Sequence, residues 1–192
     1  MTTVNPWESE LGKKIWKTKS QYFVWLRGCL RSIWSDYPLR KQWKNNSLQP
    51  ISDEQRASGK FHRQTKKIGQ CAICKEWFAG SHLECDHIQE SEGCFSYETA
   101  EQFLWHCARK LPEDFQLVCK TCHKIKSYSS REGIPFELAK ATKDVILMEK
   151  QKSLVPFLLE NGYNSGSSIG KNAKQRRQQA IEILMNQGED NV

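Results

Sequence analysis

The sequence contains no long apolar run. A membrane-spanning helix needs about 20 consecutive apolar residues, and no stretch of this chain reaches that length. A secretory signal peptide is not expected either, because residues 1–20 are polar and include four lysines. We therefore expect a protein of the cytoplasm, with no membrane partner.

Acidic residues are in deficit. The 192 residues include 22 Asp and Glu against 29 Lys and Arg, which gives a net charge of +7. Such an excess favours a polyanionic partner, most commonly nucleic acid. Charge alone is weak evidence, because many basic proteins bind no nucleic acid.

The eight cysteines carry more information than the charge. In an intracellular protein they are expected to be metal ligands or free thiols rather than disulfides. Cys71 with Cys74, and Cys119 with Cys122, form two C-x2-C pairs. Four thiolates complete a tetrahedral structural zinc site, and a metal supplies folding free energy that a small module cannot gain from burial. A redox dithiol would explain one pair but not the other.

The remaining cysteines are expected to be free thiols, mostly buried. A second zinc site formed by Cys94, His106 and Cys107 is an alternative, but its spacing fits no common structural pattern. The four residues concerned are Cys29, Cys85, Cys94 and Cys107.

Short elements are predicted around the two cysteine pairs. A strand over residues 83–88 carries Asp86 and His87 near its end. Neighbouring residues of a strand point to opposite faces. Asp86 and His87 can therefore face the same site only if the strand bends there, and otherwise each acts from its own face. The other predicted elements are a helix over 99–110, a strand over 115–118 and a helix over 122–126.

The flanking regions are predicted to be helical. Residues 11–37 have apolar residues three and four apart, and their aromatic side chains are expected to pack in a core rather than to stack on bases. Residues 44–59 are polar and predict a linker or surface loop. After Pro135 a helical segment follows, which Pro156 is expected to divide.

Two further stretches are distinguished by composition. Residues 164–170 are rich in Gly and Ser and predict a flexible linker. Residues 171–187 are helix-prone and basic at their start, and they either pack or lie on DNA as an arm. Residues 60–67 form a second basic run, which is either a solvated face or a contact with a phosphate backbone.

Three central motifs are Cys71-x2-Cys74, Glu84-Cys-Asp-His-Ile88 and Phe115-Gln-Leu-Val-Cys-Lys-Thr-Cys-His-Lys-Ile-Lys126. Taken together, they resemble those of an HNH endonuclease with a ββα-metal core in a four-cysteine zinc cradle. The resemblance covers residues 60–130, and the flanks are less specifically similar to small HNH proteins of tailed bacteriophages. It implies an α+β fold, and with the helical flanks and the linker we expect four regions, 1–59, 60–130, 131–163 and 164–192.

The resemblance implies a role for each residue that matches these motifs. His87 is the general base, and Asp86 and His123 hold a divalent cation, magnesium or another. The family's central Asn, which braces the loop between the strands, falls at Asp114. An Asp accepts hydrogen bonds but cannot donate them.

The function implied is hydrolysis of DNA, by nicking or by cutting both strands, in a bacterial host cytoplasm if the chain is phage-encoded. One alternative is a zinc-dependent nucleic-acid-binding module without catalysis, which Asp114 would favour. Another is a protein-interaction zinc domain that docks through its N-terminal aromatic residues. The residues expected to contact DNA are Lys60, Arg63, Lys66, Lys67, Lys124 and Lys126.

Overall fold

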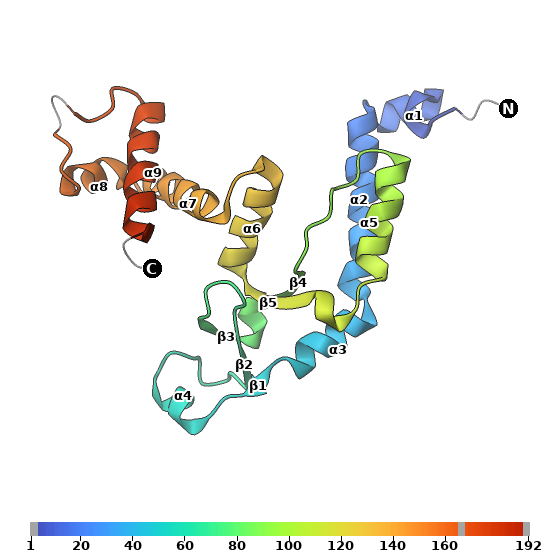
Figure 1. Cartoon of the computed structure of the whole chain (residues 1–192). Helices are drawn as coiled ribbons and strands as arrows, with labels where there is room; N and C mark the ends of the chain where they lie inside the picture. The colour runs from blue at the N-terminus through green and yellow to red at the C-terminus, as the bar shows by residue number, and fades with distance from the viewer. Residues whose placement is uncertain (1–3, 165–167, 190–192) are drawn as a thin grey trace. The chain divides into compact units, whose positions relative to one another are not determined.

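The computed structural model describes residues 4–164 and 168–189. It combines helices with two small antiparallel sheets, which is an α+β architecture (Figure 1). The chain divides into two compact units, Met1–Lys120 and Thr121–Val192. The centre of the predicted linker, residues 165–167, lies outside the described residues.

The N-terminal helices are α1 (Glu10–Ile15), α2 (Lys19–Asp36) and α3 (Pro38–Asn46), after a 3-10 turn η1 (Pro6–Glu8). The expectation of one helical segment over 11–37 is wrong at residues 16–18, where the helix is interrupted. Thr18 caps α2 by accepting a hydrogen bond from the Gln21 N–H at 3.2 Å. A threonine at this position satisfies a free backbone donor and so begins a new helix.

Helix α2 lies side by side with α5 (Tyr97–Ala108) (Figure 1). Phe23 and Phe103 are buried where the two helices meet, and Trp7, Trp16 and Trp34 pack against them. This arrangement confirms the core-packing interpretation for these three tryptophans. Trp25, in contrast, remains 49% exposed.

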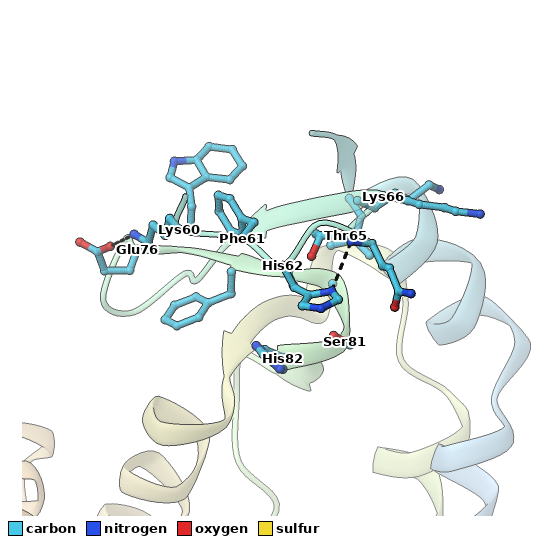
Figure 2. Close-up of a pocket in the computed structure, with 15 residues that line it drawn as sticks. Lys60, Phe61, His62, Thr65, Lys66, Glu76, Ser81 and His82 are labelled. Carbon is cyan, nitrogen blue, oxygen red and sulfur yellow. Dashed lines mark hydrogen bonds and ion pairs between the residues drawn. The ribbon is translucent and has the colours of Figure 1, made fainter. Parts of the chain in front are cut away.

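A three-stranded antiparallel sheet follows, in the order β1 (Gln49–Pro50), β2 (Lys67–Gln70), β3 (Trp77–Ala79). The prediction of a linker or surface loop over 44–59 is wrong, because the stretch contains β1 and helix α4 (Asp53–Ala57). Ser52 and Gln55 form a capping box that begins α4. The loop after α4 and strand β3 border a surface pocket of about 900 Å³ (Figure 2).

The second sheet pairs β4 (Leu83–His87) with β5 (Phe115–Cys119), and α5 is inserted between the two strands. The 3-10 turns η2 (Gly80–His82) and η3 (Pro112–Asp114) precede the two strands. The register joins Leu83 to Cys119 and His87 to Phe115. Strand β5 continues directly into α6 (Lys120–Glu132), so the chain order is β4, α5, β5, α6. Helix α6 is longer than the predicted 122–126.

Two side chains fasten the N-terminal helices to this region. The Tyr37 hydroxyl donates to the Lys110 carbonyl at 2.9 Å. The Lys44 ammonium donates to the Leu83 carbonyl at 2.6 Å. Burial lowers the pKa of Lys44, because a partly desolvated ammonium loses hydration.

The C-terminal unit continues with α7 (Phe136–Lys150), α8 (Leu154–Glu160) and α9 (Ala173–Glu189). Their common core is formed by Val145, Leu154, Leu158 and Ala180. The break between α7 and α8 lies at residues 151–153, where Lys152 has a φ of 59°, and not at Pro156. Pro156 lies in the first turn of α8, where a missing N–H is tolerated.

Helix α9 contains most of the basic C-terminal segment, for which the sequence allowed either packing or an arm on DNA. Arg177 Nε lies 2.7 Å from Glu149 Oε1 on α7, and Ala180 is fully buried. The segment therefore packs within its own unit. None of the helices in the described residues combines the length and the apolar character needed to cross a bilayer.

Candidate metal centre and histidine site

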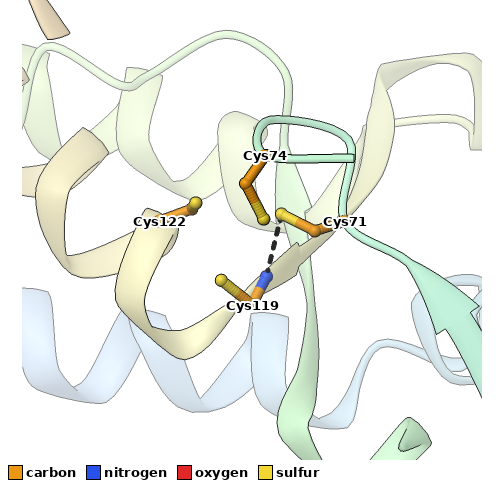
Figure 3. Close-up of side chains that lie close together, drawn as sticks. All are labelled: Cys71, Cys74, Cys119 and Cys122. Carbon is orange, nitrogen blue, oxygen red and sulfur yellow. Dashed lines mark hydrogen bonds between the residues drawn. The ribbon is translucent and has the colours of Figure 1, made fainter. Parts of the chain in front are cut away.

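Four cysteine side chains converge at the start of α6. The Sγ atoms of Cys71, Cys74, Cys119 and Cys122 all lie within 4.8 Å of one another (Figure 3). Tetrahedral zinc with Zn–S bonds of about 2.3 Å separates its sulfurs by about 3.8 Å. The cluster therefore matches the spacing prediction and fits a metal ion such as zinc. Cys94 and Cys107, proposed for a second site, lie instead in the apolar core beside Phe103.

The first cysteine pair is held by a tight turn. The Cys71 N–H donates to the Glu76 carbonyl at 2.9 Å, and the Lys75 N–H donates to the Cys71 carbonyl at 3.0 Å. Lys75 has a φ of 60°, a left-handed conformation that closes the turn. The Ala72 N–H donates to the Leu117 carbonyl at 2.7 Å, which fixes the turn to strand β5.

The electrostatics of Cys71 favour a thiolate. Burial of the Cys71 thiol raises its pKa, whereas backbone N–H groups of Cys119, Cys74 and Ile73 stabilise the thiolate by hydrogen bonding. The net effect lowers the pKa of Cys71 to about 7. The Cys119 N–H lies 3.3 Å from Cys71 Sγ. Metals bind the deprotonated form of cysteine, so these donors prepare the site for an ion.

Asp86 and His87 lie on opposite faces of β4. The strand is regular through His87, whose partner is Phe115, while the partner of Asp86 is Gln116. Gln116 Nε2 donates to Asp86 Oδ2 at 3.2 Å and to the His87 carbonyl at 3.3 Å. The strand has no bend at these residues, so the two side chains lie on opposite faces of the hairpin.

The His87 face is covered by helices. The His87 ring centroid lies 3.9 Å from that of Trp34 on α2 and 4.0 Å from that of His106 on α5. Only 8% of His87 is exposed. The imidazole is thus part of the aromatic packing that joins β4 to α2 and α5.

Asp114 accepts one backbone hydrogen bond through its side chain and another through its own carbonyl. Its Oδ2 accepts a hydrogen bond from the Leu111 N–H at 3.0 Å, and its carbonyl accepts one from the Ile88 N–H at 2.8 Å. Lys110 Nζ is 3.7 Å from Asp114 Oδ1. The bond from Ile88 joins the residue after β4 to the turn before β5, whereas the side-chain contacts of Asp114 stay within that turn.

His123 lies on α6 in the C-terminal unit, beside a group of cations. Together with Lys124, Arg131 and Lys143 it borders a pocket of about 400 Å³. Lys143 Nζ lies 4.1 Å and Arg131 Cζ 5.2 Å from the ring centroid of Tyr128. The convergence of these side chains creates a positively charged concavity suited to a phosphate group.

The basic run over residues 60–67 contains two lysines that are paired with neighbouring side chains and two cations that are exposed to solvent. Lys60 Nζ pairs with Glu76 Oε2 at 2.7 Å, and Lys67 Nζ donates to Asn45 Oδ1 at 2.7 Å. Lys66 and Arg63 are exposed, and Lys66 borders the pocket of Figure 2. On α6, Lys124 is exposed and Lys126 is half-buried.

The sequence interpretation missed several neighbours of the site. Gln116 was detectable, since it is the polar residue of the predicted strand over 115–118 and pairs with Asp86 once the register is fixed. Trp34, His106 and Lys143 carry no local signal, because they reach the site only through tertiary packing or an adjacent helix.

Comparison with protein-family models, with curated proteins and with solved structures finds no match for this chain.

Proposed function

We propose that the chain is a metal-dependent DNA endonuclease of the HNH type. The observation that carries the proposal is the antiparallel pair β4 and β5, interrupted in the chain by α5 and followed directly by α6, with Asp86 and His87 at the end of β4. His123 follows directly after Cys122 in the first turn of the helix. The four-cysteine cluster lies at the junction of strand and helix.

The chemistry assigns separate work to these residues. Hydrolysis of a phosphodiester needs a base that deprotonates water and a cation that neutralises the leaving oxygen. His87 is the base of the proposal, and Asp86 and His123 are the protein ligands of the cation. Magnesium supplies this charge well, since it prefers oxygen ligands and keeps several waters. Zinc at the four cysteines has a structural role.

Positive charge supports a DNA substrate. Lys124, Arg131 and Lys143 border the concavity beside His123, and Lys66 and Arg63 are exposed after α4. Lysine and arginine at such positions bind phosphates without reading sequence.

One observation favours a second candidate, a zinc-dependent nucleic-acid-binding module without catalysis. His87 is 8% exposed and packs against Trp34 and His106, whereas a general base must reach a water molecule. In this second candidate the histidine is a packing residue alone.

Supercoiled plasmid distinguishes the two candidates. The zinc-loaded protein is incubated with plasmid at neutral pH, with magnesium, with manganese, or without added divalent cation. The endonuclease predicts nicked or linear products only when a divalent cation is added. Retardation of the plasmid in a gel without any cleavage would instead establish the binding module.

A further inference from the structure

The pocket beside the first cysteine pair combines aromatic and cationic side chains. It measures about 900 Å³ and lies between strand β3 and the loop that follows α4 (Figure 2). Phe61, Trp77 and Phe78 border it, and all three are half-buried. Ligand pockets of proteins typically measure about 300–1,000 Å³, so the space suits a small organic group with a charged substituent.

One wall of the pocket is fixed in place. The Thr65 N–H donates to the His62 carbonyl at 2.8 Å, which closes a turn. Arg56 of α4 donates to the carbonyls of Arg63 at 3.0 Å and Thr65 at 3.4 Å. Because this wall is ordered before binding, the binding free energy is not reduced by the entropic cost of ordering it.

The polar groups of the pocket suit an anion. Lys60, Lys66 and Lys67 border it, against one acidic residue, Glu76, which is already paired with Lys60. The Gln64 N–H donates to His62 Nδ1 at 3.2 Å. A neutral imidazole that accepts at Nδ1 carries its proton at Nε2, so His62 presents a donor.

Aromatic surfaces next to lysines are the means by which proteins hold unpaired nucleotides. Bases stack on the rings, and the backbone follows the positive charge. We propose that this pocket binds an unpaired nucleotide of a DNA strand, with its base against Phe61 and its phosphate near Lys66 and His62. The inference rests on the proposed function for its choice of DNA, and it adds a preference for strands that are at least partly single.

Two fluorescein-labelled strands of twelve nucleotides test the inference. One is mixed-sequence DNA, and the other has the same backbone with abasic spacers in place of the bases. Affinities are measured by anisotropy without added divalent cation, so that no strand is cut. The wild-type protein is expected to prefer the strand that carries bases.

Phe61→Ala should weaken binding of the base-containing strand by about 5- to 150-fold, since stacking contributes about 1–3 kcal/mol per base. Its affinity for the abasic strand should change by less than about 2-fold. Phe61→Tyr retains an aromatic face and should bind as the wild type does. Phe95→Ala is the matched control, because Phe95 is 63% exposed and does not border the pocket.

Lys66→Gln is the second test and changes an exposed position. This substitution should weaken the binding of both labelled strands. It should also reduce the slope of log affinity against log salt by about 0.7, the value for one phosphate contact of a single strand. Zinc content and Tm establish that each variant is folded.

The outcomes separate this inference from the proposed function. Equal wild-type affinity for the two strands overturns the inference, and so does Phe61→Ala binding with wild-type strength, even when plasmid is cut. Preference for the base-containing strand without any plasmid cleavage supports the pocket and rejects the endonuclease. Absence of binding to either strand also overturns the inference and leaves the pocket to a ligand other than DNA.

Discussion

Trp34 and His87 lie in ring contact, with centroids 3.9 Å apart and ring planes inclined by 31°. Trp34 belongs to α2, and His87 is the last residue of β4. The residue proposed as the general base is therefore also a packing residue that helps to join a helix to the hairpin. The two roles predict different consequences for different substitutions.

Substitution of His87 separates packing from proton transfer. His87→Phe keeps an aromatic ring against Trp34, so the free energy of unfolding should change by less than about 1.5 kcal/mol. Plasmid nicking should nevertheless fall by about 10²- to 10⁴-fold, the usual contribution of a positioned base. Nicking is measured from the rate of loss of supercoiled plasmid.

His87→Ala completes this comparison. It removes the ring as well as the base, so it should cost roughly 1–3 kcal/mol of stability in addition to the loss of nicking. Nicking by His87→Phe at the wild-type rate would rule out His87 as the base. Equal stability of the Phe and Ala variants would show that the contact with Trp34 contributes nothing.

Zinc at the cysteine cluster should be necessary for the fold. Cys119→Ser removes one of four thiolates that lie within 4.8 Å of one another, and zinc binding contributes directly to folding free energy. We expect loss of bound zinc and a fall in Tm of roughly 10 °C or more, since each kcal/mol corresponds to about 2–4 °C in a chain of this size. Metal content is measured by elemental analysis and Tm by circular dichroism.

Cys29→Ser is the matched control for the zinc experiment. Cys29 is exposed and lies outside the cluster, so this variant should retain zinc and the wild-type Tm. Retention of zinc by Cys119→Ser would contradict the four-cysteine site.

Asp114 should tolerate replacement by asparagine, the residue that the resemblance to HNH endonucleases implies at this position. Its Oδ2 accepts the Leu111 N–H at 3.0 Å, and an Asn side-chain oxygen accepts the same bond. The ion pair with Lys110 at 3.7 Å is partly exposed and contributes little. Asp114→Asn should therefore hold stability within about 0.5 kcal/mol, whereas Asp114→Ala should lose about 1 kcal/mol.

Activity distinguishes a bracing role of Asp114 from metal binding. In the bracing role, Asp114→Asn cleaves at the wild-type rate or faster, and the magnesium concentration for half-maximal cleavage is unchanged. A marked rise in that concentration would make Asp114 a metal ligand. The measurement is a magnesium titration of plasmid cleavage by both proteins.

The sequence predicted those parts of the fold that are determined locally. The strand expected over 83–88 is Leu83–His87, and the strand expected over 115–118 is Phe115–Cys119, because apolar residues at strand spacing are bounded by turn residues on each side. The cysteine cluster followed from ligand spacing alone. Helix α4 could also have been predicted, since Ser52 and Gln55 have the spacing of a capping box.

The rest depends on contacts between residues distant in the chain. Nothing near His87 in the sequence indicates that Trp34 and His106 contact its ring, because these residues come from helices that precede and follow β4. The same limit applies to Lys143, which reaches the concavity beside His123 from α7. The four clustered cysteines were thus predictable from their type and spacing, whereas the surroundings of His87 and His123 were not.

His123 should act on the catalytic cation and not on zinc. The cluster already has four thiolates, so His123→Ala should retain zinc and the wild-type Tm. The magnesium concentration for half-maximal cleavage should rise by about 10-fold or more, because even residues that only support a metal ligand cost 10- to 100-fold when lost. Lys124→Gln is the matched control, since Lys124 borders the same concavity but is expected to contact a phosphate. It should reduce the salt slope of duplex binding by about 0.9 and leave the magnesium midpoint unchanged. Loss of zinc by His123→Ala would move His123 into the structural site. A changed salt slope with an unchanged magnesium midpoint would make His123, like Lys124, a phosphate contact.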